Sequence, residues 1–462
     1  MKTIPTIIGT GSLLILLTAP AQAAVSPQEA ARLGNDLTCV GAEAAGNAEG
    51  TIPPFSGKWL GTPPHVDYEP HVGQYPVDPY PEDRPRLVID GQNWQEHADN
   101  LTAGQIAMFE RYPDSYEIPV YEGRRDFRYP DRVCEIAKQN ALEAELIDGG
   151  MGFTGYNGAI PFPIPSSAME VLANHNNPYR AYTEENHARD IADVSSSGDV
   201  SIGRQENLNL NMTTHPDHMG TPVGEGTDGV MAYTRTSTLL PARNRGNVTV
   251  SVEPVNYTED RLAWSYNPGT RRVRQVPEYG FDSPFAGSYG KLTIDQDRLM
   301  NGSPHRYEWE LIGKKEIYVP ANAYRVHERN VSYDALLQTG HPNPDFLRYE
   351  LRRVWVIEGN LKDSYRHKFG KRTLYIDEDT WHGVMSDYYD RRGELVQHAF
   401  INYYYAPDIN AWHAGTSFYH DLTTGGYVAL NLFQDLDQAP VLNSGDLDPD
   451  MFTPSALRRS SH

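Results

Sequence analysis

Hydrophobic and polar residues alternate along most of the second half of the chain. From residue 228 to about residue 433 apolar positions recur every second residue, which is the period of a strand with one buried face. Short turn sequences such as Asn267-Pro268-Gly269 separate the runs, so consecutive strands are expected to pair antiparallel. The pattern therefore predicts a large antiparallel meander. Its expected strands are 230–240, 247–255, 261–266, 271–276, 308–319, 324–331, 348–361, 371–377, 383–389 and 394–405.

The alternation places apolar side chains on one face of the longest runs. In the run 348–361, Leu351, Trp355 and Ile357 share a face, and Glu350 and Arg352 point the other way. A sheet of eight or more strands with one apolar face must curl or be covered. We therefore predict an α+β protein: a large, highly curved antiparallel sheet, forming an incomplete barrel, with short helices on its concave side. The run 308–319 is expected to follow the same rule, with Trp309, Leu311, Ile317 and Val319 on one face and Glu310, Lys314 and Glu316 on the other.

Three further segments flank this half-barrel, which we place at residues 228–435. Residues 24–89 are rich in proline and lack periodicity, so they are expected to form an extended arm over the surface. Residues 90–227 are expected to be a helical segment that packs on the sheet, and residues 436–462 a C-terminal tail. The expected helices are 93–100, 102–111, one capped by Asp131, and one from Ser166 or Ser167 to about His175.

The first 23 residues have the pattern of a secretory signal peptide. Lys2 is followed by an apolar stretch from residue 7 to residue 17, and then by Pro20 and the small residues Ala21 and Ala23. The apolar stretch is too short for a membrane span, and no cysteine near the cut could accept a lipid. We predict cleavage after Ala23 or Ala24 and a soluble protein in the bacterial periplasm, free or associated with the outer membrane.

The net charge of the chain excludes some classes of binding partner, and its two cysteines indicate a disulfide. The chain carries 40 Lys and Arg against 61 Asp and Glu, a formal net charge of −21. An acidic surface repels phosphate groups, so neither nucleic acid nor an anionic membrane is expected as a partner. Cys39 and Cys134 are the only cysteines, and we predict that they form a disulfide, as exported proteins favour. Two buried free thiols are the alternative.

The sequence contains no recognisable catalytic or metal-binding motif. A Gly-x-Ser-x-Gly elbow, a phosphate loop and a His-Glu-x-x-His motif are all absent. His215 and His218 lie three residues apart, but Pro216 argues against a shared helix face, and we interpret them as surface loop residues. The carboxylates of residues 377–379 are interpreted as a solvated turn. The sequence thus predicts no catalytic residue, no metal and no cofactor.

Aromatic residues are abundant in and beside the expected strands. The chain has 29 Tyr, 7 Trp and 13 Phe. Aromatic side chains along a curved sheet can line a cavity for a lipid-like ligand, although each of them can also be ordinary core. We name as candidates for a ligand cavity Trp264, Trp309, Trp355, Trp381, Tyr318, Tyr375 and Tyr403.

Several blocks of the sequence carry a family resemblance. They are residues 40–43 with 50–53, then 160–165, 264–274, 300–309, 313–320, 348–356 and 375–381. In these blocks the chain resembles the domain of unknown function 1329 family, whose members are often labelled outer-membrane lipoprotein-sorting proteins. One departure is Ala173, which precedes Asn174 and His175 where the family usually has tryptophan.

The resemblance implies a fold and a set of partners. The second half looks like the periplasmic carriers LolA and LolB, in which an incomplete barrel wraps short helices and shelters acyl chains. The family also looks associated with inner-membrane transporters of the resistance-nodulation-division type and with outer-membrane partners.

Three functions follow as hypotheses. The first is a non-catalytic periplasmic carrier or adaptor for a hydrophobic, lipid-like molecule, working with an envelope transporter. The second is an envelope hydrolase that uses carboxylates and histidines, which requires a cleft where such groups converge. The third is a structural subunit that docks on a transporter through the proline-rich arm.

Overall fold

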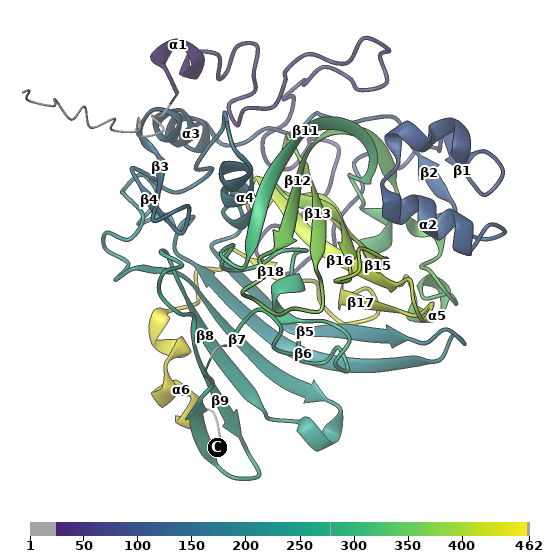
Figure 1. The fold of residues 1–462 in the computed structure, drawn as a ribbon. Helices are drawn as coiled ribbons and strands as arrows, with labels where there is room; N and C mark the ends of the chain where they lie inside the picture. Colours follow the sequence, from purple (N-terminus) through teal and green to yellow (C-terminus); the bar gives the residue numbers. More distant parts are fainter. Residues whose placement is uncertain (1–24, 278, 460–462) are drawn as a thin grey trace, which may run out of the picture.

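The fold is built on one large, curved sheet (Figure 1). We describe it from a computed structural model, and the structure describes residues 25–277 and 279–459. The predicted signal segment, with Ala23 and Ala24, lies outside these residues. The sheet contains sixteen strands in the order β1-β2-β12-β13-β14-β15-β16-β17-β5-β6-β7-β8-β9-β10, and β11 and β18 pair with β12 and β5. It is mostly antiparallel and open, which confirms the predicted α+β class and the curved sheet.

The strand bounds show how the sheet is assembled from distant parts of the chain. The strands are β1 (Leu87–Ile89), β2 (Ile118–Val120), β5 (Thr183–Val194), β6 (Val200–Asn211), β7 (Val230–Leu240), β8 (Val248–Pro254), β9 (Leu262–Asn267), β10 (Arg272–Gln275), β11 (Tyr307–Pro320), β12 (Tyr349–Leu361), β13 (Lys371–Asp377), β14 (Gly383–Tyr389), β15 (Leu395–Ala406), β16 (Ala411–Asp421), β17 (Tyr427–Leu432) and β18 (Val441–Leu442). Strands β3 (Glu145–Ile147) and β4 (Gly152–Thr154) form a separate hairpin.

The helices are short and lie on both sides of the sheet. Helix α2 packs against β14 and β15, and α4 packs against β11 and β12. The amide of Gly104 in α2 donates to Asp387, whereas His175 at the end of α4 accepts from the amide of Gly383. Among the residues that the structure describes, no helix is long and apolar enough to cross a bilayer.

The α-helices are α1 (Pro27–Ala30), α2 (Ala103–Arg111), α3 (Asp131–Glu143), α4 (Ala168–Asn176), α5 (Tyr333–Leu336) and α6 (Pro454–Arg459), and the 3-10 helices are η1 (Trp94–Asn100), η2 (Ala242–Asn244), η3 (Ile294–Gln296), η4 (Arg325–His327), η5 (Pro344–Phe346) and η6 (Pro449–Phe452).

Local capping explains where the helices begin. Thr102 and Gln105 form a reciprocal capping box at the start of α2, and Ser167 caps α4 through the amide of Glu170. The predicted cap at Asp131 is wrong, because α3 starts at Asp131 itself and its cap position, residue 130, is a proline without a side-chain acceptor.

The structure corrects three expected elements. Residues 90–227 are not only helical, because β5 and β6 are twelve-residue strands in the middle of the sheet. The expected strand 324–331 is instead the 3-10 helix η4 and a loop. In β11 the register shifts between Leu311 and Gly313. This bulge moves Ile317 to the face opposite to that of Leu311, so the expected single apolar face of this strand is wrong.

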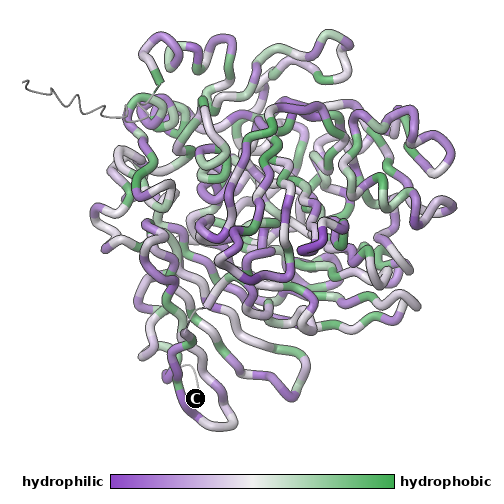
Figure 2. The backbone as a smooth tube through the Cα atoms, viewed as in Figure 1, coloured by the Kyte–Doolittle hydropathy of each residue, from purple (hydrophilic) through white to green (hydrophobic). Residues whose placement is uncertain are grey.

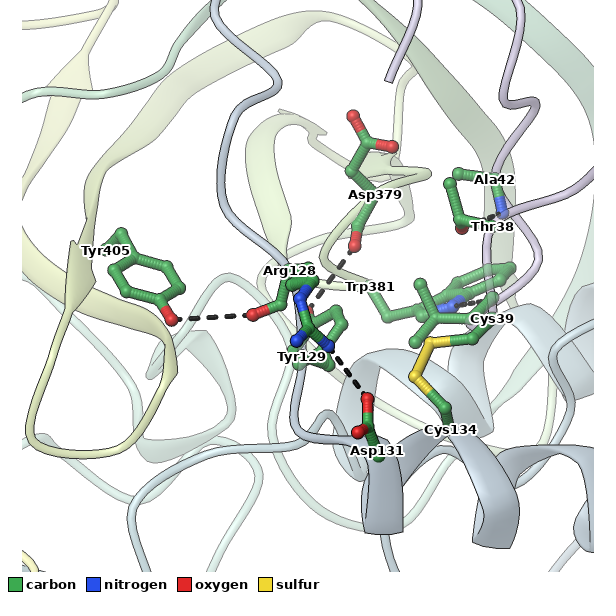
Figure 3. The surroundings of a disulfide bond; sticks show 11 residues. Thr38, Cys39, Ala42, Arg128, Tyr129, Asp131, Cys134, Asp379, Trp381 and Tyr405 are labelled. Carbon is green, nitrogen blue, oxygen red and sulfur yellow. Dashed lines mark hydrogen bonds and ion pairs between the residues drawn. A yellow bond between two sulfur atoms is a disulfide. The ribbon is translucent and has the colours of Figure 1, made fainter. Parts of the chain in front are cut away.

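The N-terminal arm is extended and is fastened to the body by aromatic side chains and a disulfide. Trp59 packs on Phe127, and the Tyr68 hydroxyl donates to Asp408 at 2.6 Å. Cys39 of the arm is bonded to Cys134 in α3, and Trp381 lies beside this bond (Figure 3).

The C-terminal residues cover the outer face of strands β6–β9. Leu457 in α6 and Phe452 in η6 belong to one apolar cluster with Leu208, Val250 and other residues of these strands. The predicted tail is therefore a packed cover, visible beside β8 and β9 in Figure 1. This cover occupies the only apolar face of strands β6–β9, which leaves their polar face turned inward.

Candidate functional site

A large cavity lies between strands β5–β9 and the segment 279–301. Its volume is about 490 Å³, within the usual range for small-molecule sites. Strands β16 and β17 contribute Ala414 and Asn431 to its wall, and the end of α4 contributes His175. The cavity therefore lies against the inner face of the curved sheet, on the side opposite to the C-terminal cover.

The floor of the cavity is a ladder of small polar side chains. Thr236 on β7 is paired with Asn207 on β6 and with Thr249 on β8, and Thr249 is paired in turn with Ser265 on β9. Paired residues of antiparallel strands point to the same face, so these four side chains form a continuous polar row. The next row along the strands joins Asn209 to Thr234 and Ser251.

Hydrogen bonds hold this polar floor in place. The Asn207 amide donates to Thr236 at 3.0 Å, the Asn209 amide donates to Asn207 at 2.7 Å, and the Thr234 hydroxyl donates to Asn209 at 3.0 Å. Such a network orients each side chain and leaves further donor and acceptor capacity toward the cavity. Apolar side chains, among them Met231, Phe285, Ile294 and Met300, complete the lining. The cavity is thus mixed in character, with polar and apolar walls.

Charged side chains gather at the inner end of the cavity. Arg180, Glu184, Arg189 and Asp297 all line it. Burial lowers the pKa of both arginines and raises the pKa of Asp297, against the opposing effect of their mutual attraction. The charged forms of Arg180, Arg189 and Asp297 are therefore less favourable in the cavity than they would be in water.

Two buried polar atoms at this end have no partner among the described residues. Arg189 on β5 and Gln205 on β6 are directly paired across the strands. The Arg189 guanidinium donates through Nη1 to Asn431 at 3.0 Å, and the Gln205 amide donates to the Ala286 carbonyl at 2.6 Å. The remaining Nε donor of Arg189 and the Oε1 acceptor of Gln205 are buried and unpartnered. A buried unpartnered pair of this kind offers one donor and one acceptor to a ligand.

Three other ionisable groups of the cavity lining, His175, Glu253 and Arg261, are already engaged. His175 bonds through Nε2 to the Met300 carbonyl at 3.1 Å and through Nδ1 to the Gly383 amide at 3.0 Å, and burial lowers its pKa to about 4. Glu253 is paired with Arg261. The His175 imidazole is therefore not free to act as a base in this cavity.

Of the seven aromatic candidates, Trp381, Tyr375 and Tyr403 are buried in the core, and the other four are partly buried and pack against it. None of them lines the cavity or the two smaller pockets near the arm. Trp355 and Trp381 stack on each other at 6.2 Å, and the Trp381 indole donates to the Val40 carbonyl at 2.8 Å. Trp264 is paired with Val250 on the outer face under α6. The remaining four are fixed by contacts of Trp309 with Pro304, Tyr318 with His97, Tyr375 with Asp387, and Tyr403 with Gly383.

The carboxylates of residues 377–379 are not a solvated turn. Asp377 and Glu378 are 3% and 2% exposed, and Arg352 donates to Asp377 and Asp379 at 3.0 and 2.9 Å. In the part of the chain that the structure describes, no three His, Cys, Asp or Glu side chains are grouped closely enough to hold a metal ion.

Sequence reasoning missed the residues that form the cavity. Arg189, Gln205 and Asp297 belong to no motif, and Glu184 and Arg180 lie in a stretch expected to be helical. One signal was present: Gln205, Asn207 and Asn209 alternate with Leu208 and Leu210, which is the period of a strand.

Fold and cavity together define an α+β protein with one open, curved sheet and a mixed polar cavity on its inner face. The chain belongs to the DUF1329 family, described as a protein of unknown function, whose model matches residues 88–458. It is 38% identical over 463 residues to the uncharacterized protein PA3922 of Pseudomonas aeruginosa, with 99% of each chain covered.

Two solved structures are similar at lower identity. One is a domain of Vibrio parahaemolyticus whose name refers to outer membrane lipoprotein sorting, with 15% identity, a TM-score of 0.40, and coverage of 60% of this chain and 91% of that one. The other is the LolA superfamily protein NE2245 of Nitrosomonas europaea, with 12% identity, a TM-score of 0.37, and coverage of 63% and 98%.

Proposed function

We propose that this protein is a non-catalytic carrier that holds one small amphipathic molecule in the cavity over strands β5–β9. The observation that carries the proposal is the cavity itself, which has about 490 Å³ of space, a hydrogen-bonded polar floor and apolar side chains opposite. A purely hydrophobic cargo, as the sequence suggested, would leave this polar floor and the two unpartnered atoms unmatched.

The inner end of the cavity receives the polar head of the ligand. The Nε of Arg189 donates to it and the Oε1 of Gln205 accepts from it, because these two atoms are buried and have no other described partner. The apolar part of the ligand lies against Phe285, Ile294 and Met300. Binding rather than catalysis fits this arrangement, since His175 is engaged through both ring nitrogens.

The carrier works in the periplasm together with an envelope transporter. The signal-like first 23 residues support this location, as does the disulfide between Cys39 and Cys134. The partnership with a transporter rests on the family resemblance, and a pull-down from envelope extracts with the tagged full-length protein tests it.

The test of ligand binding compares Arg189→Met with Arg235→Met. Arg235 lies on β7, which β6 separates from β5, and it is paired with Val250 on the outer face, away from the cavity. We expect native mass spectrometry of the wild-type protein, purified from its own host, to show one bound organic molecule. Arg189→Met should reduce the retained fraction roughly tenfold or more, the size of one lost charge-assisted hydrogen bond, and Arg235→Met should not.

The result can contradict the proposal in two ways. A wild-type protein that carries no organic molecule, and binds none from a total lipid extract of its host, would overturn the carrier function. A ligand retained equally by both variants would place the binding site outside the cavity. Thermal unfolding of each variant shows whether a loss of ligand reflects a loss of fold.

A further inference from the structure

The ends of two neighbouring hairpins carry a concentrated positive charge. The turn between β7 and β8 contains Arg243 and Arg245, and the turn and strand after β9 contain Arg271, Arg272 and Arg274. All five side chains are exposed, and neither 241–247 nor 267–276 contains an Asp or Glu. This is the reverse of the chain as a whole, whose formal net charge is −21.

The two hairpin ends form one surface. The Asn267 amide donates to Asn247 at 3.0 Å, which ties one turn to the other. Both ends project at the bottom of Figure 1, and Figure 2 shows hydrophilic stretches there. Other arginines of these strands are used in ion pairs: Arg235 pairs with Glu206 and Arg261 with Glu253. The five arginines of the hairpin ends pair with no described carboxylate. We call them the basic rim.

The basic rim lies beside residues that line one end of the cavity. Leu240, Pro241, Asn244, Asn247 and Asn267 line the cavity and also belong to the two hairpin ends. Asn244 and Asn267 are exposed, so the cavity reaches the surface between the turns. A molecule that enters or leaves by this opening passes near the arginines of the two hairpin ends.

We infer that the basic rim docks the protein, cavity opening first, on an anionic phospholipid surface. Arginine side chains near such a surface are attracted by its negative potential, which falls off within a Debye length of about 8 Å at physiological ionic strength. The rim lies roughly 20 Å along β7 from Thr234, at about 3.3 Å per residue. Salt therefore screens most of the negatively charged protein body from the phospholipid surface. The prediction that an anionic membrane is not a partner, which rested on net charge alone, does not apply to the two hairpin ends.

A lipid surface fits the rim better than a protein partner does. The core of a protein interface is enriched in arginine together with aromatic residues and methionine, which anchor it. The exposed large apolar side chains of the described residues are located elsewhere, including Leu262, which starts β9 at its far end. The rim consists of exposed arginine side chains, which are attracted to the anionic headgroups of phospholipids without a fixed binding geometry.

The experiment measures binding of the full-length mature protein to vesicles. Vesicles of phosphatidylcholine alone are compared with vesicles in which phosphatidylglycerol replaces part of it. We expect sedimentation with the second kind only, and loss of binding at high salt. Arg271→Gln, Arg272→Gln and Arg274→Gln together should weaken binding roughly a hundredfold. The control replaces Arg84, Arg391 and Arg392 by Gln, which changes the net charge equally at exposed positions elsewhere.

Each alternative outcome overturns the inference. Equal losses in the two triple variants would show an effect of net charge rather than of the rim. Absence of vesicle binding, with rim-dependent binding to polyglutamate instead, would identify an acidic polypeptide as the partner. Competition by inorganic phosphate at low concentration would indicate a free-anion site. The inference goes beyond the proposed carrier function, and retention of the cavity ligand by native mass spectrometry is measured separately, so either can fail alone.

Discussion

We expect the free energy of unfolding to fall by about 4 kcal/mol for each pH unit as pH drops from 6.5 to about 4. Three buried histidines supply this slope, and His413 and His420, whose pKa values burial also lowers, add to it. Burial lowers the pKa of His175 to about 4 and the pKa values of His327 and His382 to about 3, from an ordinary value of 6.5. Below pH 6.5 the unfolded chain takes up protons at these positions and the folded chain does not, so acid favours unfolding. At about one pH unit above 6.5 and higher, both states are neutral there and the effect vanishes.

Urea unfolding curves at a series of pH values measure this slope. His327→Gln is the informative variant, because His327 donates through Nδ1 to the Ala323 carbonyl at 2.6 Å and accepts at Nε2 from the Thr416 amide at 2.8 Å. A glutamine amide can fill both roles without titrating. The slope should fall by about 1.4 kcal/mol per pH unit in this variant. His187→Gln, at an exposed position, should leave the slope unchanged. A stability that is flat between pH 6.5 and pH 4.5 would contradict the prediction.

The parts of the sheet that sequence could predict are those with one polar and one apolar face. Strands β7, β8, β9 and β10 fall within one or two residues of the expected runs. Their outer face packs on the C-terminal cover and their inner face borders the cavity, so the alternation is preserved. Strands β12–β15 were also expected, on the period of two and on the turn sequences between the runs.

Strands without alternation were missed. Residues of β16 and β17 are buried almost throughout, because the sheet is covered on both sides there. The runs 411–421 and 427–432 therefore carry no period of two to recognise. Strand β5 contains Glu184, Glu185, Arg189 and Asp190, which local propensity assigns to a helix or a loop. Its pairing with β17 is a long-range interaction that no local pattern reports, whereas its pairing with β6 closes across the short turn 195–199.

Predicting the candidate site required knowing which face of each strand is turned inward, and the sequence does not show this. Alternation separates two faces of a strand, but it does not say which face turns toward a cavity and which toward a cover. We placed the aromatic residues inside, since apolar faces usually form the interior. The structure uses the apolar face of β6–β9 to bind α6 and turns Asn207, Thr236 and Thr249 inward. The cover is formed by residues more than 180 positions later in the chain than these, which the pattern of the strands cannot anticipate.

Replacement of Arg352 by methionine is expected to cost about 3–5 kcal/mol of the free energy of unfolding, because it leaves buried carboxylates without their counter-ion. Arg352 is 4% exposed and lies within 3.0 Å of both Asp377 and Asp379. Burial opposes its charge, but the carboxylates of Asp377, Asp379 and Glu350 outweigh burial and raise the pKa of Arg352. Methionine retains most of the apolar stem, so the loss reports mainly on the charge.

The same network holds the N-terminal arm, which makes the expected effect of Arg352→Met larger than that of an isolated pair. Asp379 also accepts from Arg125, whose guanidinium donates further to the carbonyls of Glu43 and Pro53 in the arm. Loosening Asp379 therefore weakens the contact between arm and sheet, and limited proteolysis within residues 43–60 should be faster in the variant. Arg32→Met is the control, since Arg32 and its partner Asp36 are 48% and 59% exposed and their pairing should not affect stability measurably. A loss in Arg352→Met below about 1 kcal/mol, the range of exposed pairs, would show that the buried network does not hold the arm in place.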